Sequence, residues 1–487
     1  MSFTNALESE LNETAYTENG ALSKATTKDS VLDFFSKCGA LRKNGEEALR
    51  YFKEAFKADE TLSLRALFYM RDVRGGQGER ENFRIIIQWL AKNHKESLLR
   101  NMIHIPVFGR YDDFYSLVDI PEVSNDVLTI MKEQFETDIS LCKEDKSVSL
   151  LGKWLKSENT SSKESCRLGK ITRKFFGLSS SEYRKSLVLL RNKINIIETL
   201  MTQKKWDEIP YEHVPSHAMK LYTKAFSKRD QERFKEYLEA VKKGEKKINS
   251  STLYPYDIVH SLLNKSVGRE ELESLQAQWS SLPDYLEGSE EKNGIVVADV
   301  SGSMYGTPIE VAISLALYFS ERNTGVFKDY FMTFSDNPEL VKVQGNNLKE
   351  KIENISRASW GFSTNIQSVF DLILRTSVKN KIPEEEMPSK IFIISDMQFN
   401  CACTSNNKTN FEIIEEKYKA AGYKRPVLVF WNVRASSGTP VTKDENGTFL
   451  VSGCSPSILK NAMNTKAVTP MDLMLEVLNS ERYSMIL

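Results

Sequence analysis

One short segment of the sequence combines a carboxylate and two hydroxyls at a spacing that suits a metal ion. Asp299, Ser301 and Ser303 are separated by Val300 and Gly302. Side chains two residues apart on such a tight loop can converge on one cation. All three donors are hard oxygens, which favour Mg²⁺, Mn²⁺ or Ca²⁺ and argue against zinc.

Two further oxygen donors follow later in the chain. Thr364 lies in a polar segment, residues 361–365, that leads into an expected helix, and Asp396 follows the apolar run 391–394. Parallel strands place their carboxyl ends at one edge of a sheet, where such sheets bind ligands. The competing interpretation is a structural loop with capping Ser and Asp side chains. We predict a divalent-metal site, with Mg²⁺ the expected ion and Mn²⁺ or Ca²⁺ the alternatives, built from Asp299, Ser301, Ser303, Thr364 and Asp396.

The last two fifths of the chain have the pattern needed to position these donors. Short apolar runs alternate with amphipathic segments, which predicts a mostly parallel, doubly wound α/β domain over residues 289–487. The predicted strands are 295–300, 330–334, 390–395, 427–433 and 448–451. The predicted helices are 309–322, 348–355, 366–376 and 411–421. Thr307 is the expected N-cap of the first of these helices, with Pro308 in its first turn and Glu310 three residues after the cap.

Residues 1–288 contain one helical pattern after another. Asp29 is a typical N-cap for the first of them. The predicted helices are 30–36, 46–56, 62–70, 83–91, 181–190, 194–201, 217–226, 231–243 and 269–275. Successive helices joined by short polar turns are typical of α-solenoids, although no fixed sequence period is present. We therefore predict an all-α, HEAT-like helical-repeat domain. We expect it to be curved or ring-like, with the α/β domain packed against it after a polar hinge at 287–294.

The composition excludes several classes of protein. Hydrophobic residues make up 40% and charged residues 27% of the 487 positions, as in ordinary globular chains. No apolar run is long enough to span a membrane, and the N-terminus lacks the features of a secretory signal, so we expect a cytoplasmic protein without membrane contacts. The cysteines are sparse and form no CxxC pair, which argues against a zinc or disulfide framework.

The balanced net charge conceals a basic middle section. Residues 150–247 contain 23 Lys and Arg against 12 Asp and Glu. Such a concentration indicates a polyanionic partner, although solvated helix faces would give the same count.

Several N-terminal segments together resemble a known family. They are YMRDVRGGQGER (69–80), IPVFGRYDD (105–113), KWL (153–155), YRK (183–185) followed by LR (190–191), and VPS (214–216). This set resembles the Ro-like family, which has the layout of the Ro autoantigen and its TROVE module: a helical-repeat ring closed by a von Willebrand factor A domain. The metal constellation is similar to the metal-ion-dependent adhesion site of von Willebrand factor A domains. Met397 departs from that pattern, because the family commonly has Gly after the last Asp.

The resemblance implies binding of RNA, with single-stranded ends in the ring and structured RNA outside. Cations and aromatic faces suit this role. The residues expected to contact RNA are Lys153, Trp154, Lys156, Arg167, Lys170, Arg173, Lys174, Arg184, Lys185 and Arg191. Trp154, Phe175 and Phe176 could instead be core residues. Arg71, Arg74 and Arg80 could meet phosphate, or could pair with Asp72, Glu79 and Glu81.

The resemblance also implies that Asp299, Ser301, Ser303 and Thr364 hold the ion directly or through water, with Asp396 nearby. An acidic group of the ligand would complete the coordination, so a protein with such a side chain is a second expected partner. The last 195 residues contain no histidine beside the metal, and no Walker or GxSxG motif occurs. We therefore expect a monomeric, non-catalytic RNA-binding protein. The alternatives are a protein-binding scaffold and a metal-dependent nuclease or phosphoesterase.

Overall fold

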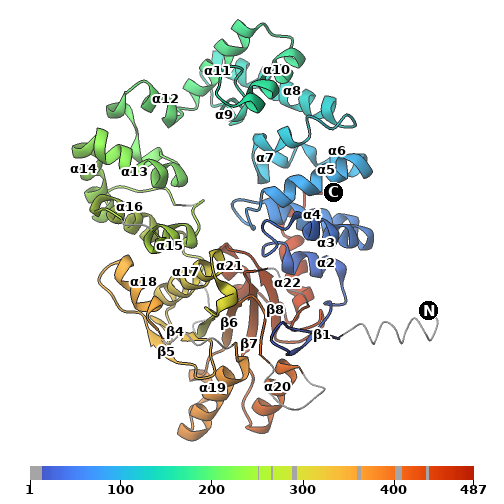
Figure 1. Ribbon diagram of the computed structural model, residues 1–487, viewed down its shortest axis with the longest axis vertical. Helices are drawn as coiled ribbons and strands as arrows, with labels where there is room; N and C mark the ends of the chain where they lie inside the picture. The colour runs from blue at the N-terminus through green and yellow to red at the C-terminus, as the bar shows by residue number, and fades with distance from the viewer. Residues whose placement is uncertain are drawn as a thin grey trace, which may run out of the picture.

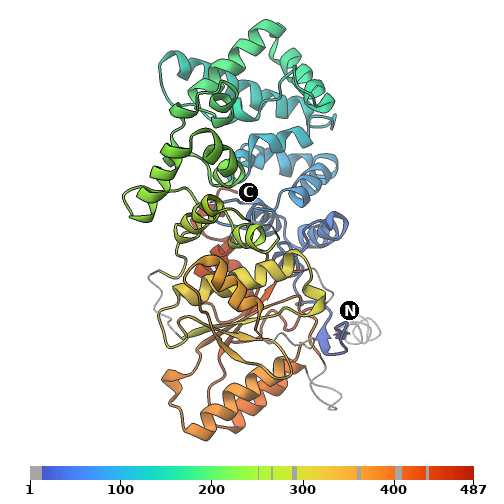
Figure 2. The same ribbon diagram turned by 60° about the vertical axis from the view of Figure 1, so that its left-hand side comes forward.

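The chain forms a ring in which an arc of helices leaves an α/β unit and returns to it (Figure 1). The computed structural model describes residues 14–250, 252–264, 267–287, 293–358, 364–400, 409–434 and 438–487. Figure 2 shows that the arc and the α/β unit follow one another along the long axis of the molecule. No helix in these described ranges combines the length and the apolar character needed to cross a membrane.

The first limb of the helical arc begins where the sequence predicts its first helix. The Asp29 carboxylate accepts a hydrogen bond from the Leu32 amide, and Asn44 and Asp59 cap the next two helices in the same way. The limb consists of α2 (Ser30–Lys37), α3 (Gly45–Ala58), α4 (Glu60–Arg71), α5 (Glu81–Asn93), α6 (Lys95–Met102), α7 (Ile105–Phe108) and the 3₁₀ helix η1 (Tyr111–Ser116).

The far side and the return limb contain helices that the sequence analysis missed. They are α8 (Ser124–Lys143), α9 (Leu151–Trp154), α10 (Lys163–Phe176) and α15 (Pro255–Asn264). In α10 the buried face is a narrow stripe, Leu168, Thr172 and Phe176, in a helix that is otherwise rich in charged and polar residues. The predicted members are α11 (Ser180–Lys193), α12 (Ile197–Thr202), α13 (Ser216–Arg229), α14 (Gln231–Lys242) and α16 (Arg269–Ser280), with the 3₁₀ turns η2 (Trp206–Glu208) and η3 (Tyr211–His213).

The α/β unit is built on one six-stranded sheet. Its strands are β3 (Gly294–Ala298), β4 (Tyr330–Thr333), β5 (Leu340–Lys342), β6 (Lys390–Ser395), β7 (Val427–Asn432) and β8 (Thr448–Ser452). Their order is β5-β4-β3-β6-β7-β8, parallel throughout except for the short edge strand β5, which the sequence analysis missed. In this order the chain reverses direction across the sheet between β3 and β6, which is the switch point where doubly wound sheets bind ligands.

Both faces of the sheet are covered, which explains why its strands are apolar at consecutive positions. Val296 and Phe392 belong to the core cluster shared with the helical arc, whereas Val297 and Ile393 belong to a second cluster on the opposite face. The helices of the unit are α17 (Thr307–Arg322), α18 (Leu348–Ser356), α19 (Ile366–Asn380), α20 (Asn410–Ala420), α21 (Ser457–Asn464) and α22 (Pro470–Leu478), with the 3₁₀ turns η4 (Gly302–Met304), η5 (Glu384–Glu386) and η6 (Glu481–Tyr483).

The start of α17 differs from the prediction. Gly306, and not Thr307, occupies the N-cap position, and no side chain caps the helix. Gly306 has a φ of 93°, a conformation that glycine adopts without steric cost. The helix therefore begins at Thr307, one residue earlier than a Thr307 cap would imply, with Pro308 still in its first turn.

The N-terminus corrects the expectation of an entirely helical domain over residues 1–288. Strands β1 (Thr14–Tyr16) and β2 (Leu22–Lys24) form an antiparallel hairpin. This hairpin lies on the α/β unit, where Lys24 forms a β-bridge with Thr439. Strands of three residues are too short to show an alternating pattern, and the hairpin depends on a partner more than 400 residues away.

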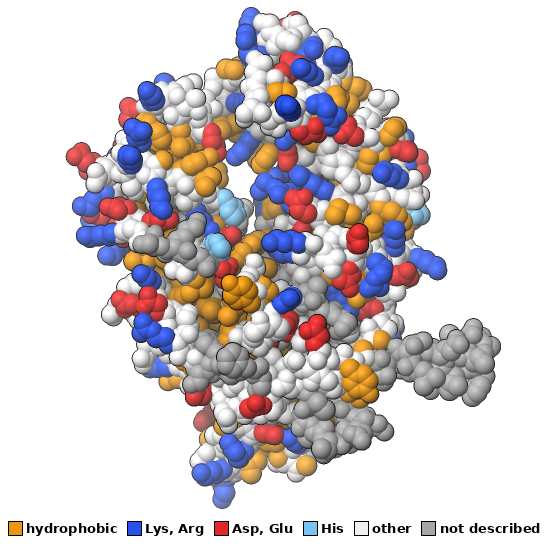
Figure 3. Space-filling model, in the orientation of Figure 1, with side chains coloured by type: hydrophobic (Ala, Val, Ile, Leu, Met, Phe, Trp, Pro, Cys, Tyr) orange, Lys and Arg blue, Asp and Glu red, His pale blue; other side chains and the backbone are white. Residues whose placement is uncertain are grey.

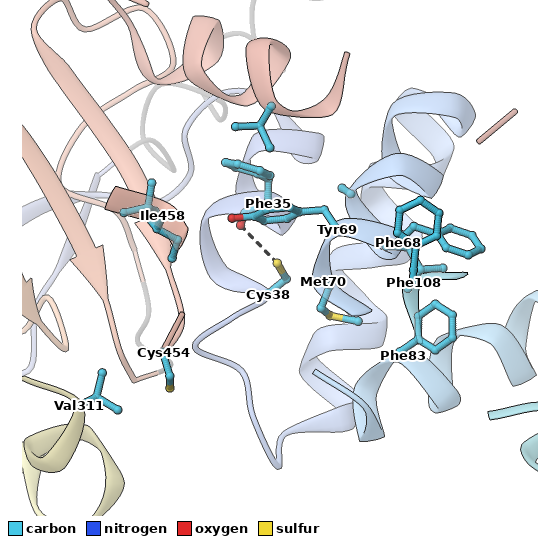
Figure 4. Packing of buried hydrophobic residues seen from close by; sticks show 14 of the residues in the cluster. Phe35, Cys38, Phe68, Tyr69, Met70, Phe83, Phe108, Val311, Cys454 and Ile458 are labelled. Carbon is cyan, nitrogen blue, oxygen red and sulfur yellow. Dashed lines mark hydrogen bonds between the residues drawn. The ribbon is translucent and has the colours of Figure 1, made fainter. Parts of the chain in front are cut away.

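The first limb and the end of the chain are joined by a shared core. Helix α22 packs against α2 and α4, and α2 also packs against β8. Figure 4 shows Phe35, Tyr69 and Phe108 from the arc in the same cluster as Ile458 and Cys454 from the α/β unit. At the very end of the chain, Leu487 exchanges two hydrogen bonds with the Asn101 side chain of α6.

The return limb is attached at a second junction. The Trp279 indole N–H of α16 donates to the Glu321 carboxylate of α17 at 2.6 Å. Tyr318 of α17 accepts from the Tyr285 amide at 3.1 Å. The two limbs also meet directly, because the Tyr254 hydroxyl donates to the Gln77 carbonyl at 3.2 Å. These contacts close the ring.

Segment 69–80 holds the first junction together through the side chain of Asp72. Asp72 is fully buried and accepts hydrogen bonds from the Arg482 guanidinium at 2.6 Å and from the Tyr483 hydroxyl at 2.9 Å. Burial alone would raise the pKa of this carboxyl, but the bonds from Arg482, the Arg74 amide and Tyr483 outweigh it and lower the pKa. Asp72 therefore ties the last residues of the chain to α4.

We expect Asp72→Asn to destabilise the protein by about 2 kcal/mol at pH 7, because hydrogen bonds to a charged group contribute roughly 1.5–3 kcal/mol. A carboxyl with a lowered pKa stabilises the fold above its unfolded value of about 4 and loses that effect as the pH falls through the folded pKa. The difference in the free energy of unfolding between wild type and Asp72→Asn should therefore become smaller below about pH 4. Urea unfolding as a function of pH measures it. Glu481→Gln, an exposed neighbour in η6, is the matched control and should change stability by less than about 0.5 kcal/mol.

Candidate metal centre and nucleic-acid surface

Asp299 and Asp396 come together because they follow neighbouring parallel strands. Ala298 of β3 is in register with Ile394 of β6, so the residues after both strands emerge at the same edge of the sheet. This is the switch point between the two halves of the sheet. The predicted position of both carboxylates at the carboxyl edge thus agrees with the topology.

Asp299 is buried, and no cationic side chain of the described residues pairs with it. Its Oδ1 accepts from the Ser301 amide at 2.8 Å and its Oδ2 from the Ser395 hydroxyl at 2.7 Å. Burial raises the pKa of Asp299 to about 6, against the effect of these hydrogen bonds, and the nearby charge of Asp396 raises it further. Among the described residues, no Lys or Arg forms an ion pair with either carboxylate. Two adjacent acidic groups that lack a counter-charge are the environment that a divalent cation neutralises.

The two serines of the loop lie beside Asp299. Their hydroxyl oxygens are 3.1 Å apart, which brings both within reach of one ion. The carbonyl of Ser303 also accepts a hydrogen bond from Arg434, a residue after β7 that the sequence analysis did not consider.

Thr364 contacts Gln398 and Asn400, in the segment that follows β6. Its hydroxyl is 2.6 Å from the Gln398 carbonyl, and the Gln398 amide donates to the Asp396 carboxylate at 3.1 Å. Gln398 therefore links Thr364 to Asp396. Residues 361–363 of the predicted loop lie outside the described residues, as do Cys401 and Cys403.

Met397 keeps the turn for which a glycine would be the usual residue. Its φ is 64°, in the left-handed region, and its side chain is buried in the second core cluster. A non-glycine residue in this conformation costs of the order of 1–3 kcal/mol, which the surrounding packing must offset. Met397 departs from the adhesion-site pattern, yet the backbone after Asp396 still adopts the left-handed turn that glycine would form there.

The donor set fits a hard divalent cation. It consists of two carboxylates and three hydroxyls, with no nitrogen or sulfur donor. No cluster of three or more His, Cys, Asp or Glu side chains with metal-binding geometry occurs in the described ranges, so a carboxylate-rich or zinc-type centre is not found there. The four described cysteines, Cys38, Cys142, Cys166 and Cys454, are all free.

Half of the predicted RNA-contacting residues have partners within the protein. Arg191 donates to the carbonyls of Gly152 and Leu155, and Arg173 donates to Glu158 and to the Leu178 carbonyl. Lys156 forms an ion pair with Asp112, and Arg167 forms ion pairs with Asp119 and Glu164. The Trp154 ring contacts the Arg110 guanidinium.

The remaining cations are available to solvent. In the described part of the chain, none of them forms an ion pair with a carboxylate; they are Lys153, Lys170, Lys174, Arg184 and Lys185. Lys170 and Arg184 line the same surface cavity of about 560 Å³ between α10 and α11. Phe176 is a core residue that packs on Phe135 with ring centroids 4.9 Å apart.

A cation–aromatic stack lies at α7 and α9 and consists of Arg110, Lys153 and Trp154. The Arg110 guanidinium lies 4.8 Å and the Lys153 ammonium 5.7 Å from the centroid of the half-buried Trp154 ring. Burial lowers the pKa of Arg110, and the positive charges of Arg71 and Arg80 lower it further. The carboxylates of Asp113 and Asp112 oppose this effect only in part, so the pKa of Arg110 stays below its usual value. Arg110 was not among the predicted contacts, because nothing in the sequence brings it to Trp154.

The arginines of segment 69–80 have different roles. Arg71 is buried and donates through Nε and Nη2 to Asp113, at 2.9 and 2.8 Å. Arg80 pairs with Glu81 at the surface. The Arg74 side chain donates to the Val107 carbonyl, at 3.4 Å. Arg71 thus braces the fold, and its predicted alternative role in phosphate binding does not fit its burial.

Comparisons with known proteins match two family models to this chain. Residues 17–118 and 155–290 match a family model described as Domain of unknown function (DUF2828), and residues 293–483 match Domain of unknown function (DUF7788). The chain is also similar to Uncharacterized protein L728 of Acanthamoeba polyphaga mimivirus. The two are 30% identical over 504 residues, which cover 95% of this chain and 87% of that protein. At this identity over nearly the full length of both proteins, the chain belongs to the same family as the mimivirus protein.

Proposed function

We propose that this protein is a non-catalytic RNA-binding protein of the Ro type, whose α/β unit is a von Willebrand factor A domain with a divalent-metal site. The observation that carries the RNA-binding role is the closed ring with Lys and Arg side chains around its opening. Figure 3 shows Lys and Arg side chains gathered at the rim of the opening that the ring encloses. Lys153 and Trp154 belong to α9 and Arg110 follows α7, and both helices lie on the side of the arc that faces this opening (Figure 1).

The stack has the chemistry that an unstacked base and its phosphate require. An indole face accepts a base by stacking, and the adjacent cations neutralise the backbone. A phosphate bound beside Arg110 would add the negative charge that favours the charged form of this half-buried guanidinium. The exposed cations of α10 and α11 supply further contacts for the phosphates of the bound RNA.

The sheet topology and the donor set support the proposed metal site. Asp299 and Asp396 meet at the switch point, and Asp299 is a buried acid without a cationic partner in the described chain. When bound, the metal would supply positive charge and an open coordination position for an acidic group of a ligand. Asp299, Ser301, Ser303 and Thr364 would hold it, with Asp396 nearby.

The RNA proposal is tested by the salt dependence of binding. Each phosphate neutralised on a single strand contributes about 0.7 to the slope of log affinity against log salt. The triple variant Lys170→Ala, Lys174→Ala, Arg184→Ala should therefore lose about 2 units of slope if each side chain contacts one phosphate. Fluorescence anisotropy of a labelled single-stranded oligouridylate, titrated at several salt concentrations, measures the slope. Trp154→Ala should weaken binding by about 1–3 kcal/mol at every salt concentration, because stacking does not depend on ions.

A variant with the same change in charge provides the control. Lys328→Ala, Lys349→Ala, Lys379→Ala removes three exposed lysines from the α/β unit and should leave the slope unchanged. Equal loss of slope in both triple variants would mean that only net charge matters, and the assigned surface would be wrong. Absence of RNA binding in wild type would favour the protein-binding scaffold. Metal-dependent cleavage of the oligonucleotide would favour the nuclease.

A further inference from the structure

The connection between β1 and β2 lies along the backbone that carries Asp396. The Thr17 hydroxyl donates to the Phe399 carbonyl at 2.6 Å, and the Glu18 amide donates to the Gln398 side chain at 2.5 Å. Gly20 forms a β-bridge with Asn400. Residues 17–20 therefore lie alongside residues 398–400, next to the candidate metal centre.

Within this connection, Asn19 contacts a proposed metal-binding residue. Its side-chain amide donates to the Gln398 carbonyl at 2.6 Å and to the Thr364 hydroxyl oxygen at 3.2 Å. The Thr364 hydroxyl has one proton, which it can donate to the Gln398 carbonyl at 2.6 Å or to the Asn400 side chain at 3.0 Å. A hydroxyl that donates once and accepts once retains one lone pair for a cation. Asn19 thus fixes which lone pair remains.

We propose that Asn19 is a positioning residue of the metal centre, which orients Thr364 toward the ion from the opposite end of the sequence. The proposal rests on the proposed metal site. Partners that orient metal-binding side chains contribute roughly 10–100-fold to metal affinity. Asn19 is an exposed side chain and its bond to Thr364 is long, so the lower end of that range applies.

The same contacts couple the metal to the N-terminal hairpin. If docking of residues 17–24 raises metal affinity, binding of the metal must favour docking by the same factor, because coupling between two equilibria is reciprocal. The hairpin has further anchors independent of Asn19, such as the bond from the Ser23 hydroxyl to the Thr439 carbonyl at 2.8 Å. Loss of Asn19 alone should therefore weaken the coupling without undocking the hairpin.

A double-mutant cycle on the full-length protein tests the proposal. Calorimetric titration with Mg²⁺ gives the affinity of wild type, Asn19→Ala, Thr364→Ala and the double variant. Asn19→Ala should reduce affinity about tenfold in the wild-type background. It should have less than about a twofold effect when Thr364 is already Ala, because a residue that acts through Thr364 has nothing left to position. Glu18→Ala, on the same turn but without a side-chain contact to Thr364 in the described structure, should bind Mg²⁺ like wild type.

Hydrogen exchange of residues 17–24 provides a readout that does not depend on affinity. Mg²⁺ should slow exchange in wild type and should slow it less in Asn19→Ala. If Asn19→Ala lowers affinity equally in both Thr364 backgrounds, or leaves it unchanged, the role of Asn19 is refuted while the metal site stands. If wild type binds no Mg²⁺, the proposed metal site itself fails and the role of Asn19 fails with it.

Discussion

Replacement of Asp299 by Asn should have opposite effects on stability with and without metal. At pH 7, above the raised pKa of about 6, the buried carboxylate is ionised and unfavourable in the metal-free fold. A shift of this size corresponds to about 3 kcal/mol, since one pKa unit is 1.36 kcal/mol. Asp299→Asn is nearly isosteric and removes that charge, so its melting temperature in EDTA should equal or exceed that of wild type.

In Mg²⁺ the order should reverse. A ligand that binds only the folded state stabilises it by mass action, by about 2.7 kcal/mol at a hundredfold excess over its dissociation constant. Wild type should therefore melt higher in Mg²⁺ than in EDTA, whereas Asp299→Asn should melt at the same temperature in both. Differential scanning calorimetry measures all four states.

The exposed Asp371 supplies the control for this reversal. It pairs with Lys417 at the surface, far in sequence from the loop, and Asp371→Asn should shift both melting curves equally and by little. Equal Mg²⁺ stabilisation of wild type and Asp299→Asn would refute the assignment of the ion to this loop. If Asp299→Asn lowered the melting temperature in EDTA as much as in Mg²⁺, the carboxylate would be structural and would need no metal.

Asp113→Ala should be the most destabilising single change in the helical arc. Asp113 is fully buried and accepts from Arg71 through two nitrogens, from Arg84 at 2.8 Å and from the Arg110 amide at 3.0 Å. Its removal leaves the buried Arg71 guanidinium without a counter-charge. Breaking a buried ion pair from one side costs about 3–5 kcal/mol. Guanidinium chloride unfolding of the purified variant gives the value.

A second variant distinguishes the ion pair from the space that Asp113 fills. Replacement of both partners of a buried pair by apolar groups is far less costly than removal of one. Arg71→Met combined with Asp113→Ala should therefore recover part of the stability that Asp113→Ala loses. Glu81→Ala, which removes the exposed partner of Arg80, should change stability by less than about 1 kcal/mol. A cost below that value for Asp113→Ala would contradict the structural role of this network.

The sequence by itself determined most elements of the α/β unit, though not β5, α21 or α22, and the position of its two carboxylates. Continuous apolar runs at 295–298 and 391–394 indicate burial on both faces, as in a covered parallel sheet. Once those runs are neighbouring parallel strands, the residues that follow them must meet at one edge. Asp299 and Asp396 could therefore be placed from the printed residues, because a local pattern encodes each strand and topology does the rest.

The fate of individual cations was not determined by the sequence. Arg71, Arg173 and Arg191 look alike in the sequence, yet each donates to an acceptor elsewhere in the fold, whereas Lys170 and Lys174 form no ion pair in the described chain. A charged side chain carries no local signal of its partner. Whether it is exposed depends on which helices pack beside it, and that is a property of the tertiary structure.

Only the tertiary structure decided the closure of the ring and the composition of the metal centre. The bond from Arg482 to Asp72 spans 410 residues, and the bond from Asn19 to Thr364 spans 345. No periodicity links such positions, since helical and strand patterns extend over a few turns or residues at most. These contacts form because the α/β unit brings both ends of the helical arc together, and the free energy of that shared core, not any local preference, places Asn19 beside Thr364.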